Sequence, residues 1–285
     1  MEKRYWLIDL DGVIWRGSKY IEKSIDALKI LRSAGRDLIF FTNNSFSTLG
    51  ELVSKLNVDG LDVPVDNILT SSIAACQLVH EGDNVLCVGG AGIREAVELK
   101  KAKAYFVSDL HKSDIKNLNI TYKDIFEFLA VYGSSGESSI KFSSVVVGLA
   151  FGISFYDIAL SANLIKNGAL FIATNDDPSY PIQNGLEIPG AGSIVASIQV
   201  ASQISPTVAG KPNDLAIQLT KAKTSDGEIE MTVGDRLSTD GKFATKLETR
   251  FGLVTSGIEE HSDLESADRI LTCSNLYELV QMYFR

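Results

Sequence analysis

The sequence is poor in the residues that hold disulfide-rich or metal-stapled folds together. Its 285 residues include three cysteines and three histidines. The cysteines form an odd set without C-x-x-C spacing: Cys76, Cys87 and Cys273. They argue against a disulfide framework and are typical of buried thiols in a reducing cytosol. The histidines are scattered without the spacing of metal ligands, which argues against a zinc site: His80, His111 and His261.

An excess of positive charge and long apolar runs are also missing. The formal net charge is −9, which argues against nucleic acid and anionic membranes as partners because both are themselves negatively charged. A small phosphorylated molecule remains compatible, since its site needs only a few local cations and amides. No apolar run approaches the length of a membrane span, and Asp9 comes too early for a signal peptide. We therefore expect a cytoplasmic protein without a membrane partner.

What the sequence does contain is a series of short apolar runs that alternate with helical patterns. Near-continuous apolar strands separated by helices predict an α/β fold whose parallel sheet is covered on both faces. The expected strands are 5–10, 37–42, 84–89, 104–108, 142–149, 169–174, 231–234, 250–254 and 270–271. The expected helices are 24–34, 47–56, 70–80, 156–167 and a segment that starts at 189–193 and runs through 202.

The domain organisation is read from the chemistry of the strand ends, because no linker divides the chain. The length allows one large or two modest domains. The segment from about residue 82 to 181 lacks the acidic and Thr/Asn strand ends found on both sides of it. We expect one domain made of residues 1–81 and 182–285, interrupted by a second, inserted α/β domain of residues 82–181.

Two carboxylates follow the first predicted strand. Asp9 and Asp11 lie two residues apart, so their side chains start out facing the same way. Like charges this close, partly removed from water, raise a pKa unless a cation or hydrogen-bond donors neutralise them. The pair suits a divalent metal together with an attacking group. The alternative is a strand that ends in an ordinary Asp-Gly turn.

Three more predicted strand ends or turns carry polar groups. The run 42–45 (TNNS) offers a hydroxyl and two amides for phosphate oxygens, although it also fits a helix N-cap. Lys211, held between Gly210 and Pro212, provides an ammonium that could neutralise phosphate and a carboxylate, or an ordinary surface lysine. Asp235 and Asp240 follow the strand at 231–234, where the alternative is a capped helix start. Ligands of open α/β sheets bind beyond the carboxyl ends of strands, so we expect the four elements to meet there.

In its motifs and their order, the chain resembles the haloacid dehalogenase (HAD) superfamily. Within it, the sequence is similar to the subfamily of NagD-like proteins, p-nitrophenyl phosphatases and phosphoglycolate phosphatases. The matching pieces are DLDGVIW, TNNS, ATNDDPSYP, GAGS, GKPN and GDRLSTD, in the family order and over nearly the whole chain. The resemblance implies a Rossmann-like core with a central parallel sheet and an inserted α/β cap of the C2 type.

The resemblance also implies a role for each motif residue. Asp9 would be the nucleophile that forms an aspartyl-phosphate, and Asp11 the general acid and base. Mg²⁺ would be held by Asp9, the main-chain carbonyl of Asp11 and Asp235. The phosphoryl oxygens would be bound by Thr42, Asn43 and Lys211, with Asn44 a weaker candidate for the wall of the site. Asp240 would support the site from behind, and Lys211 would also pair with Asp9.

The chain departs from the family pattern at three places. Ala150 stands where the cap motif often has Asp, so a relative's substrate cannot be transferred through the cap. Asp176 precedes Asp177 as an extra acid, and we expect a hinge-loop turn there rather than a metal or substrate contact. Gly241 replaces an apolar residue and is expected to loosen the helix start. The run 89–92 (GGAG) lacks full G-x-G-x-x-G spacing and is interpreted as a tight turn, not a dinucleotide site.

The leading hypothesis is a Mg²⁺-dependent phosphatase of small phosphorylated metabolites. A phosphomutase and a dehalogenase share the core, although dehalogenation needs neither the second Asp nor the metal. A phospho-ligand-binding or regulatory protein is the alternative outside enzymes. The physiological substrate cannot be read from the cap residues. Related proteins often dimerise through the cap, which makes a homodimer through the cap one option.

Overall fold

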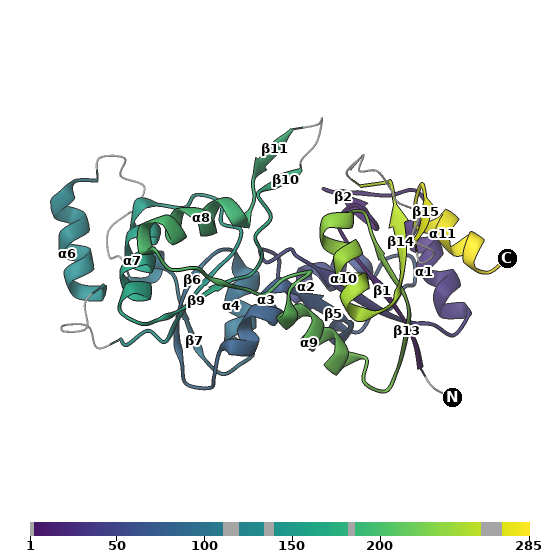
Figure 1. Ribbon diagram of the computed structural model, residues 1–285, viewed down its shortest axis with the longest axis horizontal. Helices are drawn as coiled ribbons and strands as arrows, with labels where there is room; N and C mark the ends of the chain where they lie inside the picture. Colours follow the sequence, from purple (N-terminus) through teal and green to yellow (C-terminus); the bar gives the residue numbers. More distant parts are fainter. Residues whose placement is uncertain (1–2, 111–119, 134–139, 182–185, 258–269) are drawn as a thin grey trace.

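A computed structural model describes residues 3–110, 120–133, 140–181, 186–257 and 270–285 (Figure 1). It contains a six-stranded and a five-stranded sheet, together with two short hairpins. We call the six-stranded sheet with its helices the core unit and the five-stranded sheet with its helices the cap unit. In Figure 1 the cap unit lies on the left, the core unit on the right, and a short hairpin rises between them. His111 and His261 lie outside the described residues.

The core unit is built on a parallel sheet in the order β15-β14-β13-β1-β4-β5. The chain enters at the centre with β1, moves to one side with β4 and β5, and later returns to the other side. The topological switch point therefore lies at the carboxyl end of β1, where open α/β sheets bind ligands. The strands are β1 (Lys3–Ile8), β4 (Asp37–Thr42), β5 (Ile68–Thr70), β13 (Gly227–Gly234), β14 (Arg250–Val254) and β15 (Ile270–Cys273).

Both faces of the core sheet are buried because alternate side chains of β1 enter different apolar clusters. Trp6 and Ile8 pack in one cluster with α1 and α11, while Tyr5 and Leu7 pack in the other with α3, α9 and α10. The helices are α1 (Ser24–Ser33), α2 (Leu49–Leu56), α3 (Ser71–Ala75), α9 (Asp214–Lys223), α10 (Lys242–Leu247) and α11 (Leu276–Tyr283). The predicted α/β class with a parallel sheet covered on both faces is confirmed.

The cap unit has a parallel sheet of its own, in the order β12-β9-β8-β6-β7. Its strands are β6 (Asn84–Val88), β7 (Lys103–Tyr105), β8 (Ser144–Val147), β9 (Leu170–Ala173) and β12 (Thr207–Val208). Its helices are α4 (Ala91–Glu98), α5 (Val107–Leu110), α6 (Tyr122–Tyr132), α7 (Phe155–Lys166) and α8 (Ala191–Ser202). Because β12 pairs with β9, we propose that the inserted unit extends past residue 181 and includes α8 and β12.

The two units share a continuous apolar cluster. Val85, Cys87 and Ile93 of the cap unit belong to the same cluster as Leu7 and Phe41 of the core sheet. Two glycines permit close approach of the main chains, since a Cβ at either position would collide with the core loop at 46–47. These are Gly90, which caps α4, and Gly92, whose N–H donates to the Phe46 carbonyl at 3.0 Å. In this structure the glycine run at 89–92 therefore serves packing.

Several elements differ from those expected. The helix expected over 70–80 is shorter, with α3 capped by the Thr70 hydroxyl and followed by one 3-10 turn. The strand expected over 104–108 ends at Tyr105, and α5 begins at Val107. A turn of π-helix, Leu237–Gly241, occupies the position where a loosened helix start was expected. None of the helices that the structure describes is long and apolar enough to cross a membrane.

Candidate active site

A cleft opens at the carboxyl ends of β1, β4 and β13, the three central strands of the core sheet. It is lined from the core unit by the predicted site residues Asp9, Asp11, Thr42, Asn43, Asn44, Lys211, Asp235 and Asp240. From the cap unit and the segments that join it to the core it is lined by Leu149, Asn175, Asp177, Ser179, Tyr180, Gly190 and Ala191. The structure thus brings together every residue that the sequence placed in the site.

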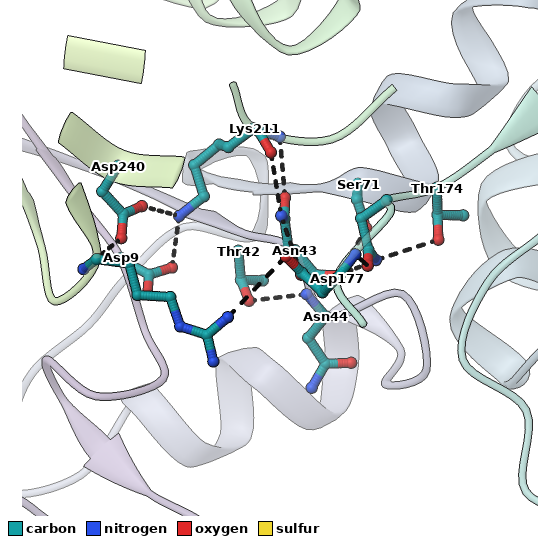
Figure 2. A network of polar contacts seen from close by, with 11 residues as sticks. Asp9, Thr42, Asn43, Asn44, Ser71, Thr174, Asp177, Lys211 and Asp240 are labelled. Carbon is teal, nitrogen blue, oxygen red and sulfur yellow. Dashed lines mark hydrogen bonds and ion pairs between the residues drawn. The ribbon is translucent and has the colours of Figure 1, made fainter. Parts of the chain in front are cut away.

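Lys211 lies at the centre of the buried charges. Its Nζ is 2.7 Å from Asp9 Oδ1 and 2.6 Å from Asp240 Oδ1, as Figure 2 shows. Burial alone lowers the pKa of Lys211, but the Asp240 and Asp9 carboxylates more than offset this and raise it well above its usual range. The ammonium therefore stays charged across the physiological range.

The Lys211 main chain is held by Asn43 at the end of β4. Asn43 Oδ1 accepts from the Lys211 N–H at 2.9 Å, and Asn43 Nδ2 donates to the Lys211 carbonyl at 3.2 Å. The same Nδ2 donates to Asp177 Oδ2 at 3.2 Å. Both amide hydrogens and the amide oxygen of Asn43 are thus already engaged, as Figure 2 shows. The peptide bond between Lys211 and Pro212 is cis.

Two carboxylates pair with the Lys211 ammonium, and a third lies close to them. Ligand oxygens of Asp9, Asp235 and Asp240 all lie within 4.8 Å of one another. Both Asp240 oxygens have partners, because Oδ1 pairs with Lys211 and Oδ2 accepts from the Arg236 main-chain N–H at 3.3 Å. Asp240 is therefore a candidate for a residue that orients Lys211. Asp9 and Asp235 are the two side chains that the resemblance to the family implies as metal ligands.

The charge of this cluster fits a divalent cation. Three carboxylates against one ammonium leave an excess of two negative charges. Burial raises the pKa of Asp9 well above its usual range, and Asp240 and Asp235 add to this, while Lys211 opposes it. A divalent cation would favour the ionised form of Asp9 and offset that rise. All-oxygen ligands are those that Mg²⁺ prefers in proteins.

Gly12 allows the loop after β1 to close around Asp235. Its φ is +85°, a left-handed conformation that favours glycine, and a Cβ there would collide with Asp235 Oδ2. The glycine in the Asp-Gly turn is therefore required both by the backbone conformation and by the carboxylate beside it. The Asp-Gly turn that was the alternative interpretation is therefore present, and it lies in the wall of the cleft.

Asp11 is held from two sides through one oxygen. Its Oδ1 accepts from Trp15 Nε1 at 3.1 Å and from the Tyr180 hydroxyl at 3.2 Å. Burial raises the pKa of Asp11, while the charge of Lys55 and the hydrogen bonds from Tyr180 and Trp15 oppose that rise. A carboxyl group with a raised pKa suits a residue that must carry a proton in one step and accept one in the next.

The end of β4 shapes its own loop with side-chain oxygens. Thr42 Oγ1 accepts from the Asn44 main-chain N–H at 3.0 Å. Asn44 Oδ1 accepts from the main-chain N–H groups of Phe46 at 2.9 Å and Ser47 at 3.1 Å. The amide oxygen of Asn44 is thus used to bend the chain, and both Thr42 and Asn44 line the cleft. A phosphate oxygen accepts hydrogen bonds, so the relevant groups are the Thr42 hydroxyl and the Asn44 amide N–H groups.

The segment between β9 and α8 reaches from the cap unit to the core. Asp177 accepts from Asn43 and lies 4.0 Å from the Arg236 guanidinium, and its N–H donates to Asn175 Oδ1 at 3.2 Å. This is the expected turn, and it also brings Asp177 into the cleft. Asp176 is exposed. Ala150 is half-buried in the cap unit, and its neighbour Leu149 lines the cleft.

Sequence reasoning missed two residues that contact Asp11. Trp15 was quoted as part of DLDGVIW and Tyr180 as part of ATNDDPSYP, without a role for either. Trp15 lies four residues after Asp11, a separation at which only the turn geometry decides whether the indole meets the carboxylate. Tyr180 lies 169 residues away along the chain, and no local pattern connects the two. His80, the histidine that the structure describes, is exposed beside Asp83.

The chain is similar in sequence to known hydrolases. The family model described as haloacid dehalogenase-like hydrolase matches residues 6–102, and a second one, described as HAD-hydrolase-like, matches residues 208–279. The chain is 31% identical over 271 residues to phosphoglycolate phosphatase 1A, chloroplastic, of Arabidopsis thaliana, covering 92% of this chain and 71% of that one. It is 26% identical over 277 residues to 4-nitrophenylphosphatase of Schizosaccharomyces pombe, covering 92% and 87%.

A solved structure of a phosphatase also matches this chain. The crystal structure of a glycerol phosphate phosphatase from Mycobacterium tuberculosis in complex with magnesium superimposes with a TM-score of 0.75 at 26% identity. The match covers 98% of this chain and 76% of that one. The resemblance therefore extends over both sheets and includes a relative whose structure contains magnesium.

Proposed function

This chain belongs to the haloacid dehalogenase-like hydrolases, in the subfamily of NagD-like and 4-nitrophenyl phosphatases, and from that premise we propose that it hydrolyses phosphate monoesters of small molecules. The observation that carries the proposal is the Lys211 ammonium, clamped between Asp9 and Asp240 and 2.7 Å from Asp9 Oδ1. An arrangement that fixes one oxygen of a buried carboxylate leaves the other directed for attack. A protein that only binds a phosphorylated ligand would not need a buried carboxylate that is held in this way.

The first half of the reaction makes and breaks bonds at phosphorus. Because Lys211 holds Asp9 Oδ1, Asp9 Oδ2 attacks phosphorus, and the bond from phosphorus to the ester oxygen breaks. Asp11 gives its proton to the departing oxygen, which leaves as an alcohol. The products of this step are an aspartyl-phosphate on Asp9 and an ionised Asp11.

The second half returns the chain to its starting state. Asp11 accepts a proton from a water molecule while that water attacks phosphorus. The bond from phosphorus to Asp9 breaks, and inorganic phosphate is released. Thr42 and Lys211 donate to the phosphoryl oxygens in both halves. Asn43, whose side chain already binds Lys211 and Asp177, contributes its main-chain N–H.

A divalent cation fits the oxygens of Asp9 and Asp235 together with the main-chain carbonyl of Asp11. We propose Mg²⁺, on the excess of two negative charges and on the hard oxygen ligands of this cluster. When bound, it supplies charge neutralisation between the nucleophile and the phosphoryl group. Lys211, fixed by Asp240, provides the remaining positive charge.

The test is hydrolysis of p-nitrophenyl phosphate with Mg²⁺, with EDTA and by the Asp9→Asn variant. We expect EDTA to abolish turnover and Asp9→Asn to reduce kcat on the order of 10³-fold or more, since removing a nucleophile removes the covalent route. Asp214→Asn is the matched control, because Asp214 is exposed and pairs with Lys246, which is also exposed. Turnover unaffected by EDTA and by Asp9→Asn contradicts the mechanism, and inactivity on a broad ester panel contradicts the function.

A further inference from the structure

We propose that Tyr180 is a positioning residue for Asp11: together with Trp15 it occupies Oδ1 of that carboxyl group, so that Oδ2 exchanges the proton with the leaving group. The inference rests on the proposed function, because it specifies how the general acid is held. The orientation of Asp11 then depends on both units. Tyr180 lies in β10 (Ser179–Pro181), which extends from the cap unit, and Trp15 lies in β2 (Trp15–Arg16) of the core.

Asp11 Oδ1 is the acceptor in both hydrogen bonds. An indole N–H can only donate, so Asp11 Oδ1 acts as acceptor toward Trp15 at 3.1 Å. A tyrosine hydroxyl has an ordinary pKa of about 10 and keeps its proton at neutral pH, and the Tyr180 hydroxyl donates to Oδ1 at 3.2 Å. An oxygen that accepts two hydrogen bonds has no lone pair left for a proton. The acid proton of Asp11 is therefore assigned to Oδ2.

Asp11 and its partner Tyr180 lie in the same cleft as the proposed nucleophile. Asp9, Asp11 and Tyr180 line the same cleft, along with Arg16 and Gly17 of the hairpin that carries Trp15. Trp15 is 2% exposed and fixed in the core, whereas Tyr180 approaches from the antiparallel pair of β10 and β11 (Glu187–Pro189). The carboxyl group of Asp11 thus lies between a fixed partner in the core and a partner on the hairpin that the cap unit extends between β9 and α8.

Hydrogen bonds before and after Tyr180 along the chain hold it near Asp11. The chain before it is pinned to the core unit, because Asn175 Nδ2 donates to the Asn43 carbonyl at 2.9 Å and Asp177 accepts from Asn43 Nδ2. The hairpin after it is closed by the Gly190 N–H on the Pro178 carbonyl at 2.9 Å. With both anchors in place, Tyr180 is three residues from a fixed point on the core. The contact of Tyr180 with Asp11 and the contact of Asp177 with Asn43 are thus made by the same short segment.

The experiment compares Tyr180→Phe with the unchanged chain on a series of phosphate monoesters. The series runs from p-nitrophenyl phosphate, whose leaving group departs without a proton, to alkyl phosphates, whose leaving group requires one. The quantity is kcat/KM, which includes the step that breaks the ester bond. We expect a loss on the order of 10- to 100-fold for alkyl phosphates, the rate equivalent of a hydrogen bond to a charged group. For p-nitrophenyl phosphate we expect less than about threefold.

Two controls separate positioning from a merely structural role. Tyr132→Phe removes the hydroxyl of another cap tyrosine, which donates to the Leu110 carbonyl at 3.1 Å, and should leave the whole series unchanged. In the Asp11→Asn background, Tyr180→Phe should not change further how kcat/KM depends on the leaving group, because both substitutions act on the same proton transfer. Melting curves confirm that each variant is folded.

The outcomes distinguish this inference from the proposed function. An equal loss for alkyl and aryl esters, or additive losses with Asp11→Asn, overturns the role of Tyr180 while Asp9-dependent hydrolysis stands. A chain that hydrolyses no ester of the series overturns the proposed function, and the inference with it. A steeper dependence on the leaving group in Tyr180→Phe, absent from Tyr132→Phe, supports both.

Discussion

Lys211 shows how one side chain sets the charge balance of the site. Lys211 is 4% exposed, and its partners are similarly buried, with Asp9 8% exposed and Asp240 2% exposed. Moving charges out of water is costly, and it is tolerated here because the ammonium has two carboxylate partners at 2.7 and 2.6 Å. The lysine is therefore expected to contribute to the stability of the fold as well as to the proposed reaction.

Replacing Lys211 by Met should destabilise the protein by about 3–5 kcal/mol at pH 7, because it leaves buried carboxylates unpaired. The pKa of Asp9 would rise further above its unfolded value, so protonation would favour the folded variant and the loss should shrink as the pH falls. Urea unfolding in EDTA at pH 7 and pH 5 measures both. Lys246→Met, which breaks the exposed pair with Asp214, should cost less than about 0.5 kcal/mol. Equal losses for the two variants contradict the prediction.

At the scale of elements, Glu230 joins the central strands. It lies in β13 and accepts from Trp6 Nε1 of β1 at 3.2 Å and from Arg36, just before β4, at 2.9 and 3.2 Å. Burial raises the pKa of Glu230, but the hydrogen bonds from Arg36 and Trp6 and the charges of Arg36 and Arg4 lower it overall. Glu230 thus links the middle of β13 to the middle of β1 and to the residue that precedes β4.

The Glu230→Gln variant should be less stable by about 1–3 kcal/mol at pH 7, the worth of hydrogen bonds to a charged group. Because the folded pKa of Glu230 is depressed, its contribution is complete above the unfolded pKa, near 4.5, and is lost as the pH falls through the folded value. The difference between variant and unchanged chain should therefore narrow below about pH 4.5. Urea unfolding from pH 7 to pH 3.5 measures it. A difference that widens on acidification contradicts the depressed pKa.

Elements with strong local signals were predicted well. The strands Asp37–Thr42 and Arg250–Val254 were predicted at their observed bounds, because each is an apolar run bounded by turn residues. The helix α7 was predicted within one residue at each end, with Ser154 and Asp157 forming its capping box. Helices α6 and α9 and the pair of β10 and β11 were missed. The last two are strands of three residues each, and their pairing depends on contacts with the core rather than on local preference.

At the scale of the whole molecule, metal binding should be visible as stability. The excess negative charge of the Asp9, Asp235 and Asp240 cluster exists in the folded chain, where the three carboxylates meet. A cation that binds the folded state alone stabilises it by about 2.7 kcal/mol at 100 times its Kd. For a chain of this size the melting temperature should rise by roughly 5–10 °C.

The measurement is a series of melting curves in increasing Mg²⁺, with EDTA as the reference. Asp235→Asn should lose most of the Mg²⁺-dependent rise, because it removes one proposed ligand and one of the two excess charges. Asp214→Asn, an exposed acid outside the cluster, should keep it. If Asp235→Asn retains the full rise, the ion binds elsewhere and the proposed ligand set is wrong.

The sequence by itself determined the α/β class, the order of the motifs and the eight residues of the predicted site that line one cleft. It could do so because strand ends carry local signals, and parallel strands place their carboxyl ends at one edge. Only the tertiary structure decided that Asn43 holds Lys211, that β12 extends the cap sheet, and that Tyr180 reaches Asp11. These contacts join residues far apart along the chain, and their geometry exists only once both sheets have packed.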